Sequence, residues 1–443
     1  MRKKLKLLIL ICSVLLTIAA ISFFTVFYEG EKPLIKLSED ITIIGRNSTF
    51  NILFSDKKSG LRSVSVKITQ DGDERTVVSS DFTAKGRHDE TIAVEIDYKS
   101  LNLHDGEATL QISAIDYSLR KNRTIVSIDL PVDITPPRIS LLNSSNYINP
   151  GGSCVTTFTL SEEVKNSGVE VNDDFFTAYP VNQPDSSYYI CYFAAPLDAN
   201  EIDMKISIMA EDSAGNTSLR AIPFHIRNKK FRKDNMHIGD NFLRRKMPEF
   251  SYIHENLKDA SPLESFIYVN EKVRPDNIYE ITTLCKETAG SQLWEGTFLR
   301  LNNSATMARF GDKRTYYYGD KNIGKSTHLG VDLASTKNAI VEASNRGIIA
   351  FTGDLGIFGN TVIIDHGLGL FSFYAHLSKI KVNKGQIVKK GASIGHTGFS
   401  GLAGGDHLHY GVIVGHKFVN PQEWWDPHWI RDNIEIKVNI SSR

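Results

Sequence analysis

Apolar and polar residues follow several distinct patterns along the chain, and the first is an uncharged run near the N-terminus. Residues 7–28 (LLILICSVLLTIAAISFFTVFY) carry no charge. A helix of this length crosses a hydrocarbon core of about 30 Å. Basic residues stand just before the run, at Arg2, Lys3, Lys4 and Lys6, and such residues stay in the cytoplasm. The pattern predicts a cytoplasmic tip and single-pass transmembrane anchor over residues 1–29, with the C-terminal bulk on the exported side.

A cleaved signal peptide is the alternative interpretation of this run. Signal peptides have an apolar region of roughly 7–15 residues, followed by a cleavage site of small residues. The run here is longer, and Phe27, Tyr28 and Glu29 offer no such site. We therefore expect a retained anchor in the cytoplasmic membrane, with the rest of the chain in the periplasm or cell wall.

Residues 33–228 show a second pattern, short runs in which apolar and polar residues alternate. Runs such as SVSVKIT, IAVEID and ATLQISAID are separated by Gly, Asp, Asn and Ser, which predicts β sandwiches. The sequence AID at 114–116 is echoed by AEDSAGN at 210–216, and DITPP at 133–137 lies between them. We predict two β-sandwich modules, over residues 30–135 and 136–228.

The DITPP and AEDSAGN motifs resemble those of bacterial immunoglobulin-like modules on exported proteins. The resemblance implies that the two modules are spacers or regulators, with binding of a surface ligand as the alternative. Cys154 and Cys191 fall in strand-like segments of the second module. In an oxidising compartment they could form a disulfide, and two buried free thiols are the alternative.

Residues 229–290 show a third pattern, spaced apolar residues with Ser or Asp in front of them. The segments DNFLRRKMPEF, SPLESFIYVNEKV and DNIYEITTLCKETA are typical of capped amphipathic helices. We therefore predict a helical connector. Its basic residues, in KKFRKDN and at 244–246, are interpreted as a solvated helix face. Contact with an acidic polymer is the alternative.

From Leu293 onward the β pattern returns with many glycines, which predicts a β domain over residues 291–430 and a tail over 431–443.

The chain has 443 residues, with 51 basic and 51 acidic side chains. No overall field attracts it to nucleic acid. A hydrophobic content of 41% also excludes a polytopic membrane protein and a mainly disordered chain. Recognition must therefore be local.

Histidines and an aspartate gather within about 80 residues of this β domain: His328, Asp332, His376, His407 and His409. Imidazole and carboxylate are ligands of catalytic zinc, which takes three protein ligands and keeps one position for water. Five candidates are more than one zinc ion needs. The surplus indicates that some of these histidines transfer protons.

The spacing of these residues constrains their arrangement. His407 and His409 are two apart, so on a strand they project to the same face. His328 and Asp332 are four apart, which on a straight strand separates them by about 13 Å. We expect the chain to bend between them, and Gly330 permits a bend.

Residues 308–425 closely resemble the catalytic domain of the M23 zinc metallopeptidases, the lysostaphin and LytM-like peptidoglycan endopeptidases. The resemblance rests on several motifs together: Phe310-Gly311 with Arg314, HLGVD, VEASNRGIIAFTG, VIIDHGLG, YAHLS, VNKGQIVKKGASIGHTG and HLHYGV. It implies that His328, Asp332 and His409 bind Zn²⁺ and that His376 and His407 are catalytic. None of the five is missing, which favours an active enzyme over the non-catalytic relatives that activate other hydrolases.

Two departures from the family pattern concern the substrate rather than catalysis. Gly404-Gly405-Asp406 precedes the HLH motif where many relatives have Gly-Pro, and Gly411 stands where many have Glu. The expected fold is mainly β: a transmembrane helix, two β-sandwich modules, a short helical connector and an antiparallel β metallopeptidase domain.

The expected function is a membrane-anchored zinc endopeptidase that hydrolyses peptidoglycan stem peptides or cross-bridges. Its expected partners are peptidoglycan, the membrane and regulatory proteins, and not nucleic acid. The alternatives are a regulatory LytM-like protein that binds and activates another hydrolase, and a protease that acts on exported proteins. The preceding modules are also expected to cover the catalytic groove until a partner displaces them.

Overall fold

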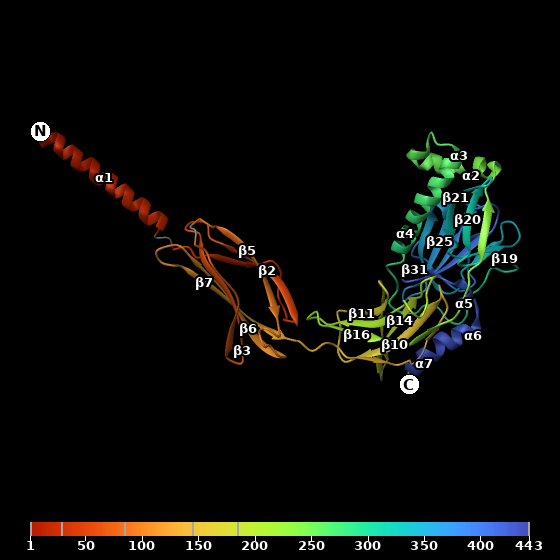
Figure 1. Ribbon diagram of the computed structural model, residues 1–443, viewed down its shortest axis with the longest axis horizontal. Coiled ribbons are helices and arrows are strands. Elements are labelled where there is room, and N and C mark those ends of the chain that lie inside the picture. The colour runs from red at the N-terminus through yellow and green to blue at the C-terminus, as the bar shows by residue number, and fades with distance from the viewer. Residues whose placement is uncertain (1, 28–29, 84–85, 144–145, 184–185, 442–443) are drawn as a thin grey trace. The chain divides into compact units, whose positions relative to one another are not determined.

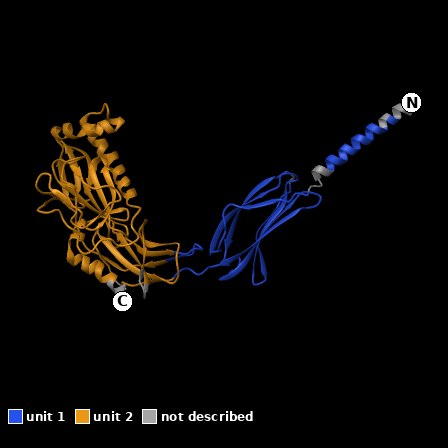
Figure 2. Ribbon diagram, turned by 180° about the vertical axis from the view of Figure 1, so that it is seen from behind, with its two compact units in different colours: residues 1–137, 211–218 blue, residues 138–210, 219–443 orange. Residues whose placement is uncertain are grey.

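The computed structural model describes residues 2–27, 30–83, 86–143, 146–183 and 186–441 (Figure 1). Contacts divide the chain into two compact units (Figure 2). Unit 1 contains residues 1–137 and 211–218, and unit 2 contains residues 138–210 and 219–443.

Residues 7–27 of the uncharged N-terminal run lie in helix α1 (Arg2–Phe27), and Tyr28 lies outside the described residues. A search of the described residues finds no helix that is both long enough and apolar enough to span a membrane. The predicted transmembrane anchor is therefore not supported.

Unit 1 contains two antiparallel sheets. One has the order β1 (Leu34–Leu37), β2 (Asn47–Ser55), β5 (Asp89–Asp97), and the other has the order β4 (Asp73–Asp81), β3 (Leu61–Gln70), β6 (Gly106–Asp116), β7 (Arg123–Val132). Ile52 and Val94 from the first sheet share one buried cluster with Val66 and Ile112 from the second. Alternation along the strands thus produces a sandwich, because every second residue turns inward. Its immunoglobulin-like character stays a prediction.

The second β region also forms two sheets. Their orders are β13 (Tyr179–Gln183), β14 (Ser186–Ala194), β10 (Ser153–Leu160), β8 (Ile139–Leu141), and β12 (Asp174–Thr177), β11 (Asn166–Val171), β15 (Ile206–Glu211), β16 (Thr217–Ala221). A parallel pair, β9 (Asn146–Ile148) and β17 (Phe224–Ile226), stands beside them. Phe158 and Phe193 of this region belong to the same hydrophobic cluster as Val412 and Trp424 of the C-terminal region. The second module therefore packs with the C-terminal domain in one unit.

The two cysteines of this region are free and buried. In the pairing of β10 with β14, Cys154 lies opposite Phe193, and Cys191 lies opposite Thr156. The cysteines are diagonal neighbours, whose α-carbons lie about 7–8 Å apart in such a ladder, too far for a disulfide. The disulfide interpretation is therefore wrong for this structure. Burial raises the pKa of Cys154 to about 12.

The basic run KKFRKDN is extended rather than helical. Its residues enter β18 (Lys233–His237), which pairs in parallel with β20 (Lys313–Tyr318). Arg232 Nη2 lies 2.6 Å from the carboxylate of Asp312, which is buried. A buried carboxylate requires a partner. The predicted helix is therefore wrong for this run, and Arg232, although half exposed, pairs with Asp312.

The predicted amphipathic segments are helical. They form α2 (Asp240–Ile253), the short 3₁₀ turn η1 (Glu255–Leu257), α3 (Pro262–Tyr268), the π-helical turn η2 (Val269–Val273) and α4 (Arg274–Leu284). Leu243, Met247 and Phe250 of α2 are buried at helical spacing. Ser261 and Glu264 form a capping box that starts α3.

An eight-stranded antiparallel sheet forms the centre of the C-terminal region. Its main order is β19 (Ala305–Ala308), β22 (Val331–Ala334), β30 (Leu408–Val414), β26 (Leu370–Ala375), β25 (Asn360–Asp365), β24 (Gly347–Asp354), β28 (Ile387–Val388), and β31 (Lys417–Val419) pairs with β30. Two smaller sheets have the orders β18, β20, β21 (Lys321–Thr327) and β23 (Ile340–Glu342), β29 (Ser393–His396), β27 (Lys379–Ile380). A 3₁₀ turn, η3 (Gly356–Phe358), precedes β25. All seven residues of β30 are buried.

The described part of the chain ends in α5 (Pro421–Trp425), α6 (Pro427–Ile430), the π-helical turn η4 (Arg431–Glu435) and α7 (Ile436–Ser441). The expected tail is therefore helical over residues 431–441. Lys437 Nζ donates to the carbonyl of Val155 at 3.2 Å. The carboxylate of Glu423 accepts from Asn149 Nδ2 and from the backbone N–H of Ser153, both at 2.7 Å. These polar contacts fix the C-terminal helices on the second β region.

Candidate active site

The central pair of the candidate site comes from two neighbouring strands. In the pairing of β22 with β30, Asp332 lies directly opposite His409. His328 belongs to the turn just before β22. Its Nε2 lies 2.9 Å from Asp332 Oδ1 and 3.0 Å from His409 Nδ1, and His409 Nδ1 lies 2.9 Å from the same oxygen. Two imidazole nitrogens and one carboxylate oxygen therefore meet at one point.

The predicted bend between His328 and Asp332 is present, since their side chains touch. Gly330 was expected to permit the bend through its conformational freedom. Its φ is not positive, so it serves a different purpose. A β-carbon on Gly330 would lie 2.6 Å from His409 Nε2 and 2.6 Å from the carbonyl oxygen of Tyr410. Glycine is needed here because the ring of His409 packs directly on the backbone.

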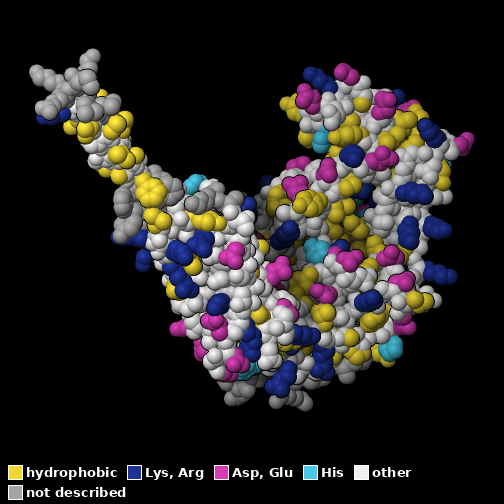
Figure 3. Space-filling view, turned by 60° about the vertical axis from the view of Figure 1, so that its left-hand side comes forward, with side chains coloured by type: hydrophobic (Ala, Val, Ile, Leu, Met, Phe, Trp, Pro, Cys, Tyr) yellow, Lys and Arg dark blue, Asp and Glu magenta, His cyan; other side chains and the backbone are white. Residues whose placement is uncertain are grey.

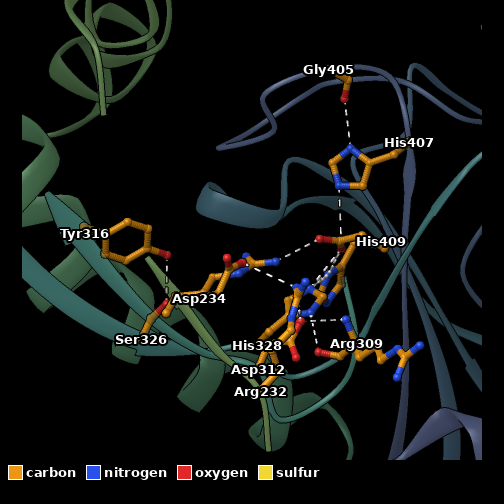
Figure 4. Close-up of polar contacts among 12 residues, drawn as sticks. Arg232, Asp234, Arg309, Asp312, Tyr316, Ser326, His328, Gly405, His407 and His409 are labelled. Atoms are coloured by element: carbon orange, nitrogen blue, oxygen red, sulfur yellow. Dashed lines mark hydrogen bonds and ion pairs between the residues drawn. The ribbon is translucent and has the colours of Figure 1, made fainter. Parts of the chain in front are cut away.

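His376 and His407 flank this cluster, with ring centroids 4.9 Å apart. His407 Nε2 lies 3.6 Å from Asp332 Oδ1, and Figure 4 shows this ring reaching the cluster from the loop that contains Gly405. His376 follows β26, whose last residue, Ala375, pairs with His409. The φ of His376 is 62°, in the left-handed region. The sheet thus brings all five predicted site residues together.

Backbone carbonyls fix the orientation of three histidine rings. The Nδ1 of His328 lies 3.0 Å from the carbonyl oxygen of Arg309. The Nδ1 of His376 lies 2.9 Å from that of Ser400, and the Nδ1 of His407 lies 2.8 Å from that of Gly405. Because a carbonyl only accepts, each Nδ1 donates and each neutral ring presents the lone pair of Nε2. These orienting groups are main-chain atoms, so no sequence motif marks them.

The three converging residues fit a zinc ion. His328, Asp332 and His409 offer ligand atoms that all lie within 4.8 Å of one another. Tetrahedral zinc, with bonds of about 2.0–2.1 Å to nitrogen, places its ligand atoms about 3.3 Å apart. The observed separations of 2.9–3.0 Å need only a small adjustment. His409 Nε2 is buried and has no hydrogen-bond partner in the described residues. The ring proton would then sit on Nε2, and the lone pair of Nδ1 would be available to the metal.

The electrostatics of the site centre on Asp332. Burial alone would raise the pKa of Asp332, but the charge of His328 and hydrogen bonds from the three nearest histidines hold it well below its usual value. Burial opposes protonation of His407, yet its contact with Asp332 raises its pKa. Burial lowers the pKa of His409 to about 4 and that of His376 well below its usual value. His376 and His409 are therefore neutral at pH 7.

Arg314 contacts the site directly, although its sequence motif gave it no role. Its Nη2 donates to Asp332 Oδ2 at 3.1 Å, while Oδ1 of the same carboxylate faces the histidines. Arg314 thereby fixes the plane of the carboxylate. A partner of this kind holds the ligand in place and tunes its basicity. The resemblance placed Arg314 in the motif, but its contact with Asp332 is seen only in the tertiary structure.

A pocket of about 310 Å³ opens over the five residues. The helical connector provides one wall of it, through Phe242 of α2, Phe266 of α3 and Arg274 of α4. In the space-filling view, hydrophobic side chains gather around a hollow in which a histidine is visible (Figure 3). The connector is therefore part of the cleft, in a position that amphipathic patterning alone does not reveal.

His366, in the sequence VIIDHGLG, lies outside this cluster. It is fully buried, with Nδ1 2.7 Å from the carbonyl oxygen of Arg346 and Nε2 2.7 Å from the hydroxyl of Ser372. Burial lowers its pKa to about 4. His366 is a neutral histidine of the core.

Comparison with known proteins agrees with this geometry. Residues 326–421 match the family model of peptidase family M23. The DD-carboxypeptidase/endopeptidase Mpg of Neisseria meningitidis serogroup B is 40% identical over 94 residues, which cover 21% of this chain and 22% of the relative. The peptidoglycan DD-endopeptidase ShyA of Vibrio cholerae serotype O1 is 42% identical over 93 residues, with the same coverage. The C-terminal region therefore carries a peptidase M23 domain.

Two solved peptidase structures are similar to parts of this chain. The catalytic domain of lysostaphin from Staphylococcus simulans has 30% sequence identity and a TM-score of 0.25, covering 29% of this chain and 96% of that one. A putative peptidase M23 from Pseudomonas aeruginosa has 20% identity and a TM-score of 0.39, covering 61% and 92%. This chain matches only about a fifth of the length of the curated relatives named above.

Proposed function

We propose that this protein is a zinc endopeptidase that hydrolyses peptide bonds in the stem peptides or cross-bridges of peptidoglycan. The observation that carries the proposal is the convergence of His328 Nε2, Asp332 Oδ1 and His409 Nδ1 beside two further imidazoles. Relatives named as peptidoglycan endopeptidases support the substrate class.

His328, Asp332 and His409 would hold the zinc ion. A bound zinc ion supplies Lewis acidity, which lowers the pKa of water towards 7 and polarises a carbonyl. Arg314 would keep the carboxylate of Asp332 oriented while it binds, because Arg314 contacts the other carboxylate oxygen. The aromatic surroundings of His409, with Phe358 and Phe373 at centroid distances of 5.6 and 6.0 Å, exclude water from its far side.

His376 and His407 would handle the protons of the reaction. Each donates through Nδ1 to a main-chain carbonyl, so each presents Nε2 as the free nitrogen. A neutral Nε2 accepts the proton of the attacking water, and a protonated one donates to the oxyanion and then to the leaving amine. Both rings line the pocket in which the peptide would lie.

We place this activity on the exported side of the cytoplasmic membrane, where peptidoglycan lies. The uncharged run over residues 7–28, preceded by basic residues, supports export of the chain. Regulatory partners would act through the second β region and the helical connector, since both pack with the peptidase domain.

Digestion of purified cell walls tests the proposal. Residues 30–443 are expected to release peptide fragments, identified by mass spectrometry, and to contain about one zinc ion per chain. Release that persists in excess chelator would refute the zinc mechanism. Binding to walls without any release would instead favour a regulatory role, and cleavage of exported proteins alone would favour a different substrate class.

A further inference from the structure

Two guanidinium groups line the pocket above the candidate zinc site. Arg314 comes from β20, and Arg274 is the first residue of α4 in the helical connector. The described lining contains one carboxylate, that of Asp332, which Arg314 already contacts. Once a divalent ion binds Asp332, the pocket carries an excess of positive charge.

Arg274 is held in place by hydrogen bonds rather than by an acid. Its Nε donates to Asn270 Oδ1 at 3.1 Å, and Asn270 Nδ2 donates to the carbonyl of Lys325 at 3.1 Å. Within the described residues Arg274 forms no ion pair. Burial lowers its pKa, and the charge of Arg314 lowers it further. A partly buried guanidinium without an acidic partner is unfavourable unless an anion joins it.

Arg314 also has unused hydrogen-bonding capacity. One nitrogen, Nη2, contacts Asp332, while Nε is buried without a partner in the described part of the chain. Guanidinium nitrogens form a planar fork that matches the two oxygens of a carboxylate. Phe242 and Phe266 line the same pocket and exclude water, which strengthens such a contact.

We infer that Arg274 and Arg314 form a carboxylate-binding subsite, and that the enzyme selects peptides with a free carboxylate close to the scissile bond. The inference rests on the proposed peptidase function and adds a substrate class to it. The carboxylate comes either from the C-terminus of a short peptide or from an acidic side chain. Arg274 lies outside the region that matches the family model, so its contribution belongs to this chain's connector.

Matched pairs of peptides test the subsite. One pair carries a terminal acid or a terminal amide, and a second pair carries a side-chain acid or its amide. We expect the acid of one pair to be cleaved with a kcat/KM at least about tenfold higher than its amide, because the amide leaves a partly buried guanidinium unpaired. The pair that shows the difference identifies the source of the carboxylate.

Variants then assign the effect to Arg274. Arg274→Gln is expected to reduce the preference for the acid to less than about threefold, mainly through KM, and Arg274→Lys is expected to retain part of it. Lys272→Gln removes an exposed charge two residues before Arg274 and should leave the preference unchanged. Zinc content and thermal unfolding show whether each variant is folded.

The outcomes separate the subsite from the function. Equal cleavage of acid and amide by the unmodified protein would overturn the subsite and leave the peptidase intact. Cleavage of no peptide and no cell wall would overturn the proposed function. In that case calorimetric binding of both acid and amide pairs of peptides to the zinc-free protein decides the subsite, and equal affinities within both pairs would reject it. If folded Arg274→Gln kept the full preference for the acid, Arg274 would be excluded from the subsite.

Discussion

Lys246 of α2 donates from Nζ to the carbonyl oxygen of Phe399 at 2.5 Å, and the ammonium lies 5.2 Å from the centre of the Phe399 ring. Lys246 is almost fully buried. The next carbonyl along the chain, that of Ser400, orients His376, and that of Gly405 orients His407. The connector therefore supports the loop that aligns both candidate catalytic histidines.

Lys246→Met is expected to lower kcat about 10- to 100-fold with little change in zinc content. Loss of the hydrogen bond to Phe399 lets the loop move, and displacements of about 1 Å have effects of this size. Lys258→Met, on the exposed part of the connector, is the control. Unchanged kcat in a folded Lys246→Met protein would show that the loop holds its position without the helix.

The zinc ligands and the proton-transferring histidines should separate experimentally. His328→Ala and His409→Ala are expected to lose zinc and activity together. His376→Ala and His407→Ala should keep about one zinc ion while activity falls about 10²- to 10⁴-fold, the range for loss of general acid–base catalysis. Metal analysis beside the wall-digestion assay checks this division. Zinc loss in His376→Ala would contradict it.

Arg314→Met should weaken zinc binding about 10- to 100-fold, because removal of groups that orient metal ligands has effects of this size. Competition with a chelator of known affinity measures the change. Arg309→Met is a matched control, since Arg309 contacts His328 only through its main-chain carbonyl and its side chain is exposed. Equal zinc affinity in the two variants would mean that Asp332 needs no orienting partner.

The sequence predicts the reacting groups of the site better than their supports. His407 and His409 lie two apart, and HLGVD forces a bend, so motif and spacing bring five side chains to one place. The supports follow tertiary structure instead. Lys246 reaches Phe399 across 153 positions, and its charge predicted a solvated face although it is buried.

Local patterning also fails where tertiary pairing decides the structure. The spacing around KKFRKDN predicts a helix with a solvated basic face, yet the last residues of this run begin β18, which pairs with β20, and Arg232, although half exposed, pairs with the buried acid Asp312. Similarly, Cys154 and Cys191 lie in neighbouring strands, as their alternating context indicates. Only the register shows that they are offset by two residues.

Glu423 should make stability depend on pH near neutrality. Burial raises the pKa of Glu423 from 4.5 to about 7, despite hydrogen bonds from Asn149 and Ser153. Between these two values the folded state holds a proton that the unfolded state releases, so the free energy of unfolding falls as pH rises. The full effect is about 3 kcal/mol.

Glu423→Gln removes the ionisation and should flatten this dependence. The variant forfeits one accepted hydrogen bond, because an amide has one acceptor oxygen, so it should be less stable than the unmodified protein at pH 5. Its free energy of unfolding should rise steadily relative to that of the unmodified protein as the pH increases from 5 to 8. Glu295→Gln, at an exposed position, controls for loss of charge. Urea unfolding at pH 5, 6, 7 and 8 measures the slopes, and parallel curves for Glu423→Gln and the unmodified protein would show that Glu423 ionises at its ordinary pKa.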